Sequence, residues 1–188
     1  MIDITQIVFL VATYFITSIP FGLILTKMFL REDIRKLGSG NIGATNVARV
    51  GGKKLGAVTL ILDALKGAVM ILFAISYYSS HDNFDLFVSL VAFIAVCGHV
   101  FPIYLRFKGG KGVATTIAVI LSIDLLIGSL VALVWILVFL AFRVSALASL
   151  ISAFSMIPLC YYLAFDPVYV YLSIALFALI LVRHKENI

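Results

Sequence analysis

Long apolar runs separated by short polar stretches dominate this chain, and their lengths suit a lipid bilayer. A spanning helix needs about 20 apolar residues, within a range of about 17–25. Five runs of this kind lie at residues 4–28, 55–78, 84–105, 146–164 and 167–182. A sixth run, 113–142, is too long for one ordinary span. The pattern predicts an all-α polytopic membrane helix bundle that forms a single domain over residues 1–188.

Composition supports lipid as the solvent of this fold. Of the 188 residues, 63% are hydrophobic and 12% are charged, whereas soluble domains average about 45–50% and about 25%. A water-soluble globule of this size could not bury the apolar surface that a mean hydropathy of +1.19 implies. We attribute the net charge of +5 to cytoplasmic loops of a membrane protein, and we expect no nucleic-acid partner.

The two cysteines do not indicate redox or metal chemistry. Cys97 and Cys160 both lie inside apolar runs, and neither belongs to a CxxC pair or a cluster of metal ligands. They are interpreted as small buried hydrophobic residues. We therefore expect no metal and no cofactor.

The charged connections predict how the chain crosses the membrane. Basic residues lie in alternate connections, at 27–54, 106–111, Arg143, Arg183 and Lys185. Acidic residues lie in the connections between them, at Asp3, 81–85, Asp124 and Asp166. Because basic loops stay in the cytoplasm, every basic connection falls on that side only if the run 113–142 breaks near Asp124.

This break gives seven transmembrane helices, with the N-terminus outside and the C-terminus in the cytoplasm. The fourth helix, over about 113–122, is then short. At 1.5 Å per residue it reaches roughly 15 Å, or half of the hydrocarbon core. We expect it to begin near the middle of the membrane or in a cytoplasmic cavity.

Polar residues inside the apolar runs suggest internal packing. Asp63 and Lys66 share one face of a helix and are expected to form a mainly structural ion pair that faces the bundle interior. His99 is expected to pack as a hydrogen-bonded side chain. Pro20, close to Gly22, predicts a kink or close packing in the first run.

The first long polar segment, 38–49, carries a GxGxxG match at Gly38, Gly40 and Gly43. A dinucleotide-binding fold would need a strand before this motif, and here both flanks are membrane helices. Closely spaced glycines can nevertheless turn successive N–H groups toward an anion. Side chains such as Ser39 and Thr45 would add donors. The alternative interpretation is an ordinary flexible loop.

The second polar segment, 106–116, contains three glycines around a lysine: Gly109, Gly110, Lys111 and Gly112. It resembles a Walker A loop, but glycine follows the lysine where serine or threonine should stand, so nucleotide hydrolysis is not supported. A glycine-rich loop that leads into a helix N-terminus remains a suitable anion site. The alternative is a basic loop that only fixes the topology.

The third polar segment is the tail, 183–188, which taken alone is a topological anchor. His184 is the only histidine on the predicted cytoplasmic side. Together the three segments suggest a cytoplasm-facing pocket that is rich in anion donors and poor in acids, which suits a phosphorylated substrate. A transporter of phosphorylated anions is the alternative, although it would need a polar path across the whole bilayer.

The segments GSGNIGATNVARVGG (38–52), GHVFPIYLRFKGGKGVAT (98–115) and RHKENI (183–188) resemble the signatures of the bacterial membrane acyl-phosphate:glycerol-3-phosphate acyltransferases, the PlsY family. The resemblance implies transfer of a fatty acyl group from acyl phosphate to the 1-hydroxyl of glycerol 3-phosphate. The products would be lysophosphatidate and inorganic phosphate, in the first step of phospholipid biosynthesis. It further implies a seven-helix enzyme in the bacterial cytoplasmic (inner) membrane, with its active site facing the cytoplasm. The oligomeric state stays open, with a monomer as the simplest expectation.

The resemblance also implies which residues line the phosphate and acyl-phosphate sites. These are Ser39, Asn41, Thr45, Asn46, Arg49, Lys111, His184 and Asn187, with a further serine at Ser145 or Ser149. Lys111, Arg49 and His184 are the candidate catalytic residues. Acyl phosphate is an already activated mixed anhydride, so positioning and charge stabilisation matter more than a covalent nucleophile.

The same residues bear on which acyl donor the enzyme uses and on which group accepts the proton of the attacking hydroxyl. The H-x4-D pair of coenzyme-A-dependent acyltransferases is absent, because Leu86 and Tyr104 stand five residues after His81 and His99. The proton of the attacking hydroxyl could pass to His184 or to a phosphate oxygen of the donor. We favour the donor phosphate, since no carboxylate except Glu186 is available to orient the histidine.

Overall fold

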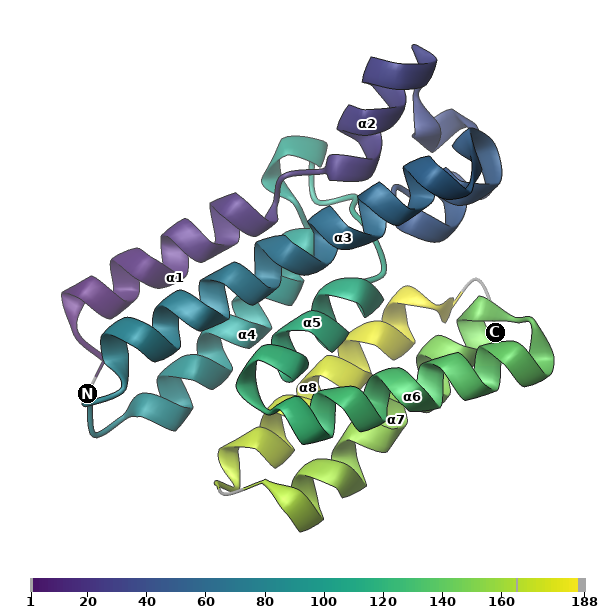
Figure 1. The fold of residues 1–188 in the computed structure, drawn as a ribbon. Helices are drawn as coiled ribbons and strands as arrows, with labels where there is room; N and C mark the ends of the chain where they lie inside the picture. The colour runs from purple at the N-terminus through teal and green to yellow at the C-terminus, as the bar shows by residue number, and fades with distance from the viewer. Residues whose placement is uncertain (1, 165, 186–188) are drawn as a thin grey trace.

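The computed structural model describes residues 2–164 and 166–185, and this part of the chain contains helices and loops but no strand. Eight α-helices follow one another in it (Figure 1). They are α1 (Ile4–Thr17), α2 (Phe21–Leu30), α3 (Ala44–Tyr78), α4 (Phe84–Val100), α5 (Val113–Ile123), α6 (Leu125–Phe142), α7 (Ser145–Leu163) and α8 (Val168–Arg183). Two short 3-10 turns, Ile34–Lys36 and Ile103–Leu105, lie in the connections.

The first apolar run is broken into α1 and α2, which confirms the kink predicted there. Pro20 lacks an N–H and disfavours helical backbone at the residue before it, so the helix cannot continue through Ile19. Gly22 then lets the start of α2 press against the backbone of Ile42, whose carbonyl oxygen any Cβ at position 22 would overlap.

Helix α3 begins at Ala44, eleven residues before the run predicted at 55–78. The alternative interpretation of segment 38–49 as a flexible loop is therefore wrong beyond Gly43. The helix is kinked at Gly52, whose φ of +85° suits glycine better than any other residue. Hydropathy alone could not find this first part of α3, because its few apolar residues alternate with polar residues and glycines and form no long apolar run.

The long run 113–142 divides at Asp124, as the charge pattern predicts. Asp124 ends α5 and caps α6, with its Oδ1 accepting a hydrogen bond of 2.7 Å from the backbone N–H of Ile127. Gly128 lets the first turn of α6 pack directly against the backbone of Leu121. Helix α5 corresponds to the short fourth helix that was predicted over about 113–122.

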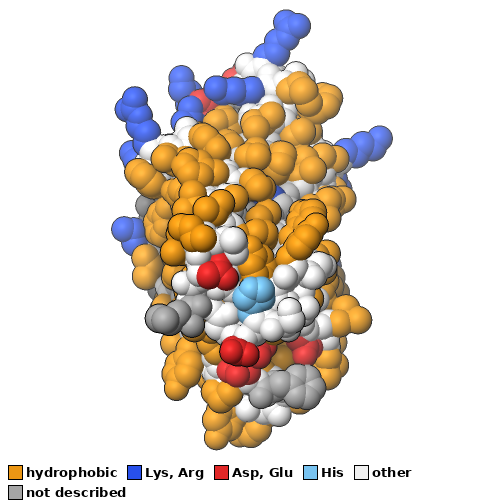
Figure 2. All heavy atoms as spheres, turned by 90° about the vertical axis from the view of Figure 1, so that its left-hand side faces the viewer, with side chains coloured by type: hydrophobic (Ala, Val, Ile, Leu, Met, Phe, Trp, Pro, Cys, Tyr) orange, Lys and Arg blue, Asp and Glu red, His pale blue; other side chains and the backbone are white. Residues whose placement is uncertain are grey.

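Apolar length and exposure agree with a membrane-embedded protein. Five helical runs are long and apolar enough to cross a bilayer: Ile4–Leu30, Ala44–Tyr78, Phe84–Leu105, Leu125–Phe142 and Ser145–Leu163. Helices α5 and α8 are apolar but shorter. Large apolar side chains face outward along the bundle, and hydrophobic atoms cover most of the face shown in Figure 2.

The core lies around α4, which α1 and α3 cover on one side and α5 and α8 on the other (Figure 1). Val91, Ala92, Ala95 and Val96 of α4 are completely buried. The α2–α3 connection, the α4–α5 loop and the end of α8 lie at one end of the bundle, while the α3–α4 and α7–α8 turns lie at the other (Figure 1). The three polar segments are thus gathered at the same end.

Candidate functional site

The glycine-rich loop before α5 is built against the end of α4. The N–H of Gly109 donates to the carbonyl of Val100 and the N–H of Gly110 donates to the carbonyl of His99, both at 3.1 Å. A Cβ at Gly109 would overlap the His99 carbonyl, and one at Gly110 would overlap the His99 ring. These two glycines are therefore required by close packing.

The loop then turns into α5 through Gly112, which adopts a φ of +86°. The N–H of Thr116 donates to the carbonyl of Gly112 at 2.8 Å and starts the helix. The N–H groups of the first turn have no acceptor within the helix, and they give this end a partial positive charge. Lys111, half-buried, stands directly before it.

Several glycine N–H groups are used inside the fold, contrary to the expectation that the glycines point theirs at an anion. Besides Gly109 and Gly110, the N–H of Gly40 donates to Leu37 at 3.0 Å, and that of Gly43 donates to Asn41 Oδ1 at 2.8 Å. The case for an anion site at this end therefore rests on the start of α5 and on cationic side chains.

Arg183, the last residue of α8, clamps the glycine loop from the opposite side. Its Nη2 donates to the carbonyl of Gly109 at 3.1 Å, and its Nε lies 3.4 Å from the carbonyl of Gly110. The guanidinium also lies 5.7 Å from the ring centre of Phe101. The second and third polar segments are therefore in direct contact. The prediction treated Arg183 only as a topological charge.

His184 follows Arg183 and is buried, with 2% of its surface exposed. Its Nδ1 lies 2.8 Å from the carbonyl oxygen of Ile180. A carbonyl only accepts, so this hydrogen bond places the proton on Nδ1 and leaves a lone pair on Nε2 when the ring is neutral.

The surroundings of His184 favour that neutral ring. Burial is the main cause that holds the pKa of His184 below its ordinary value, and the hydrogen bond to Ile180 partly offsets it. The positive charges of Lys111 and Arg183 lower this pKa further. The structure thus places Lys111 within electrostatic range of the His184 ring.

Asn46 organises the first polar segment from inside. Its Nδ2 donates to the carbonyls of Leu37 (3.0 Å) and Asn41 (2.9 Å), and its Oδ1 accepts from the N–H of Ser39 at 2.9 Å. The side chain is 2% exposed. Both ends of the amide are occupied within the fold, so Asn46 shapes the loop, and the substrate contact that the resemblance implies for it stays a prediction. Asn41 likewise holds the turn at Gly43.

The remaining predicted residues are placed as follows. Ser39, Thr45 and Arg49 are exposed at the same end. Ser149 is buried, where its hydroxyl donates to the carbonyl of Ser145 at 2.8 Å and accepts from Trp135 Nε1 at 3.2 Å, while Ser145 is half-buried at the start of α7. Asn187 lies outside the described residues. Substrate contacts for all of these stay a prediction.

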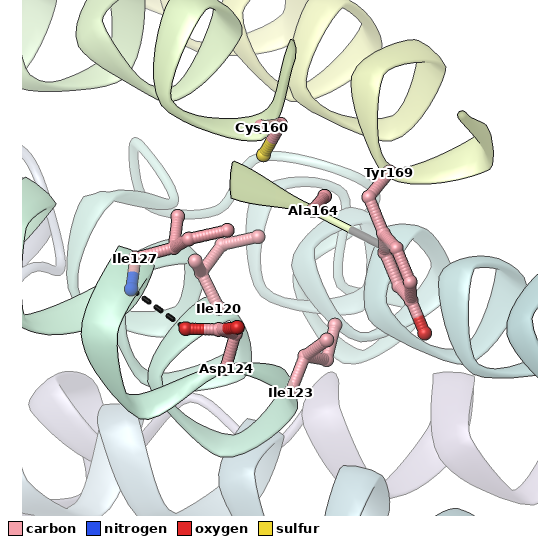
Figure 3. A pocket seen from close by; sticks show the side chains of 7 residues that line it. All are labelled: Ile120, Ile123, Asp124, Ile127, Cys160, Ala164 and Tyr169. Atoms are coloured by element: carbon pink, nitrogen blue, oxygen red, sulfur yellow. Dashed lines mark hydrogen bonds between the residues drawn. The ribbon is translucent and has the colours of Figure 1, made fainter. Parts of the chain in front are cut away.

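A small cavity of about 40 Å³ lies at the other end of the bundle (Figure 3). It is lined by Ile120, Ile123, Asp124, Ile127, Cys160, Ala164 and Tyr169. Its charged group is the Asp124 carboxylate, which already caps α6, and the Tyr169 hydroxyl donates to Asp85 at 2.7 Å. A lining with a carboxylate and no cation does not suit a phosphorylated ligand. Among the described residues, no group of three or more His, Cys, Asp or Glu is placed to hold a metal ion.

These features define an integral membrane helix bundle with a cationic, glycine-rich loop at one end. The family model for glycerol-3-phosphate acyltransferase matches residues 7–188. A glycerol-3-phosphate acyltransferase of Pelagibacter ubique is 42% identical over 177 residues, which cover 94% of this chain and 88% of the relative.

Solved structures agree with the family model. The fold is similar to a crystal structure of PlsY (YgiH), an integral membrane glycerol 3-phosphate acyltransferase, in its glycerol 3-phosphate form. The TM-score is 0.91 at 33% identity, with 97% of this chain and 90% of that chain covered. The lysophosphatidic acid form of the same protein gives a TM-score of 0.88 at 33% identity, with 97% of this chain and 89% of that chain covered.

The chain belongs to the glycerol-3-phosphate acyltransferase (PlsY) family. It is accordingly a membrane-embedded acyltransferase that acts on glycerol 3-phosphate in phospholipid biosynthesis.

Proposed function

We propose that this enzyme takes its acyl group from acyl phosphate and transfers it to the 1-hydroxyl of glycerol 3-phosphate. The hydroxyl oxygen forms a bond to the acyl carbonyl carbon, and the bond between that carbon and the phosphate oxygen breaks. The hydroxyl proton leaves with inorganic phosphate, so the products are lysophosphatidate and phosphate. The product fits the lysophosphatidic acid held by the similar PlsY structure.

The observation that carries this proposal is the position of Lys111. It stands at the positive end of α5 and within electrostatic range of His184, while Arg183 fixes the loop on which it lies. A cation and a helix end in one place stabilise the negative charge that builds on a leaving phosphate. Arg49, exposed at the same end, is proposed to hold the glycerol phosphate.

The donor phosphate is proposed as the proton acceptor. His184 has its Nδ1 bonded to Ile180 at 2.8 Å, and within the described residues no carboxylate orients it. Its Nε2 is then proposed as a hydrogen-bond acceptor for the hydroxyl, and the donor's oxygen removes the proton.

The orientation in the membrane is part of the same proposal. We infer seven crossings, with the glycine loop and the end of α8 on the cytoplasmic side of the inner membrane and the N-terminus outside. The support is the charge distribution. Lys and Arg side chains project from the upper part and flanks of the molecule in Figure 2, with a few acidic side chains among them, while the lower half shows acidic side chains without Lys or Arg beside them. Basic loops remain in the cytoplasm.

The experiment that tests the donor uses purified protein in detergent, with phosphate release as the readout. We expect release from acyl phosphate to depend on glycerol 3-phosphate, and we expect acyl coenzyme A to support no transfer. Acceptor-independent release, or comparable turnover with both donors, would contradict the proposal.

A further inference from the structure

The buried charges beneath the glycine loop have no part in the proposed chemistry. Lys66 Nζ lies 2.9 Å from Asp63 Oδ1, and both side chains are 3% exposed. His99 Nδ1 lies 3.5 Å from the same carboxylate oxygen. These three residues, the Asp63–Lys66–His99 cluster, join the middle of α3 to the end of α4.

One side of the cluster reaches the glycine loop. The His99 ring packs against the Cα of Gly110 so closely that a Cβ there would overlap it. The carbonyl of His99 accepts the N–H of Gly110 at 3.1 Å. Any shift of His99 therefore moves the residue directly before Lys111.

A second side of the cluster reaches the start of α5. The hydroxyl of Thr115, in the first turn of that helix, donates to the backbone carbonyl of Asp63 at 3.0 Å. Gly67, one turn further along α3, leaves the space into which the Thr115 methyl group packs. The helix end that follows Lys111 is therefore fixed to the same residue that pairs with His99.

The third side of the cluster reaches the first polar segment. Lys66 Nζ donates to the carbonyl of Ile19 at 2.9 Å, at the break between α1 and α2, and lies 5.7 Å from the ring centre of Phe21. The next residue, Gly22, presses on the carbonyl of Ile42. The cluster thus contacts the glycine loop at Gly110. It also contacts Ile19 and Phe21, which precede the residue that packs against the first polar segment.

Stability alone is a poor explanation for this arrangement. A buried ion pair contributes little net stability, because desolvation offsets the attraction. His99 Nδ1 has Asp63 Oδ1 at 3.5 Å and makes no hydrogen bond within the described part of the chain, and an unsatisfied buried polar atom is costly. A network kept only for stability would be better replaced by apolar residues.

We propose that the Asp63–Lys66–His99 cluster is a positioning unit that sets the glycine loop and the start of α5 for glycerol 3-phosphate. The three residues act through Gly110, Thr115 and Ile19. This inference rests on the proposed function of the loop as the phosphate site. At metal sites, removing an outer residue that orients a ligand typically costs roughly 10–100-fold in affinity or activity, and we expect an effect on that scale here.

The test is a titration of thermal unfolding with glycerol 3-phosphate, for the parent and three variants in detergent. A ligand that binds only the folded state raises Tm in a way that reports its Kd. His99→Gln keeps a polar side chain of similar size, and Asp63→Asn keeps the shape of the carboxylate. Gln6→Leu is the control, since Gln6 exchanges hydrogen bonds of 3.1 and 3.0 Å with Asn83 at the other end of the bundle.

We expect His99→Gln and Asp63→Asn to raise the Kd for glycerol 3-phosphate at least roughly tenfold. Gln6→Leu should lower the ligand-free Tm and leave the Kd unchanged. A folded His99→Gln or Asp63→Asn with the parental Kd would overturn the proposal. Loss of folding in both, with Gln6→Leu folded, would overturn it in favour of a purely structural role. The parent titration separates failure of this inference from failure of the proposed function. If glycerol 3-phosphate does not raise the Tm of the parent, the proposed phosphate site itself is contradicted.

Discussion

Arg183 and Gly109 are 74 residues apart in sequence, yet the guanidinium of one donates to the backbone carbonyl of the other at 3.1 Å. This hydrogen bond joins the end of the last helix to the loop that carries Lys111. It is made to a backbone atom, so it fixes the position of the loop itself.

Replacing Arg183 should therefore impair both stability and turnover. A hydrogen bond from a charged group contributes about 1.5–3 kcal/mol, so Arg183→Met should lower the free energy of unfolding by about that amount. Arg183→Lys should recover only part of it, because a single ammonium cannot reach both carbonyls as the planar guanidinium does. The measurements are thermal unfolding and acyl transfer.

Lys185→Met is the matched control for Arg183→Met. It removes the same charge from an exposed side chain two residues further on. It should leave both Tm and turnover nearly unchanged. Equal losses in the two variants would mean that net charge at this end, rather than the contact with Gly109, is what matters.

Lys111→Met should reduce kcat more than any change in the first polar segment that leaves the loop intact. Removing one preorganised electrostatic contact typically costs about 10²–10³ in rate, and we expect at least that loss with the fold retained. Lys111→Arg should recover little, since a planar fork does not replace a compact ammonium at a tight turn. Steady-state kinetics with acyl phosphate and glycerol 3-phosphate provide the measurement, and a variant within tenfold of the parent contradicts the assignment.

His184→Gln separates proton transfer from positioning. Glutamine keeps a hydrogen bond but cannot take up a proton, so a donor-phosphate base predicts a smaller loss than in Lys111→Met and an unchanged pH–rate profile. An acidic limb near pH 6–7 in the parent that disappears in the variant would identify His184 as the general base instead.

The same histidine should make stability depend on pH. Its pKa is lowered in the folded protein, so the unfolded chain binds a proton that the folded chain resists as the pH falls below about 6.5. Stability from this group is complete above that pH and is lost on acidification toward the folded pKa. We expect the Tm of the parent to fall from pH 7 to pH 5 more steeply than that of His184→Gln. Parallel curves would contradict this expectation.

Most of the helices could be predicted from the apolar runs alone. The boundary between α5 and α6 could be predicted only from the placement of charged residues. Hydropathy alone merges α5 with α6, whereas Asp124 predicts the break because aspartate caps helices and because a break there leaves every basic connection on the cytoplasmic side. The polar start of α3 was missed for the complementary reason. The first part of α3 carries no long apolar run, and Gly52 interrupts the helical backbone that joins it to the rest of the helix.

The candidate site was predictable in its residue types but not in its contacts. The sequence indicates that glycines surround Lys111, but it cannot tell whether their N–H groups meet an anion or a backbone carbonyl. At Gly110 the structure gives the answer, because this N–H donates to the backbone carbonyl of His99. Nor could the interior role of Asn46 be distinguished from a ligand contact, because an amide in a loop suits both. Pairings such as Arg183 with Gly109 follow no periodicity.

The membrane topology is open to a direct test by cysteine labelling. In a background without Cys97 and Cys160, Asp82→Cys and Pro167→Cys place exposed thiols in the α3–α4 and α7–α8 turns, and Lys108→Cys places one in the glycine loop. Because basic loops remain in the cytoplasm, an impermeant thiol reagent applied to intact cells should label the first two and reach position 108 only after the membrane is opened. Asp82 is chosen instead of Asn83 because the side-chain amide of Asn83 donates a hydrogen bond to Gln6, which a cysteine would remove. Protection of position 167 in intact cells would contradict the seven crossings, since α5 and α6 would then have to count as one.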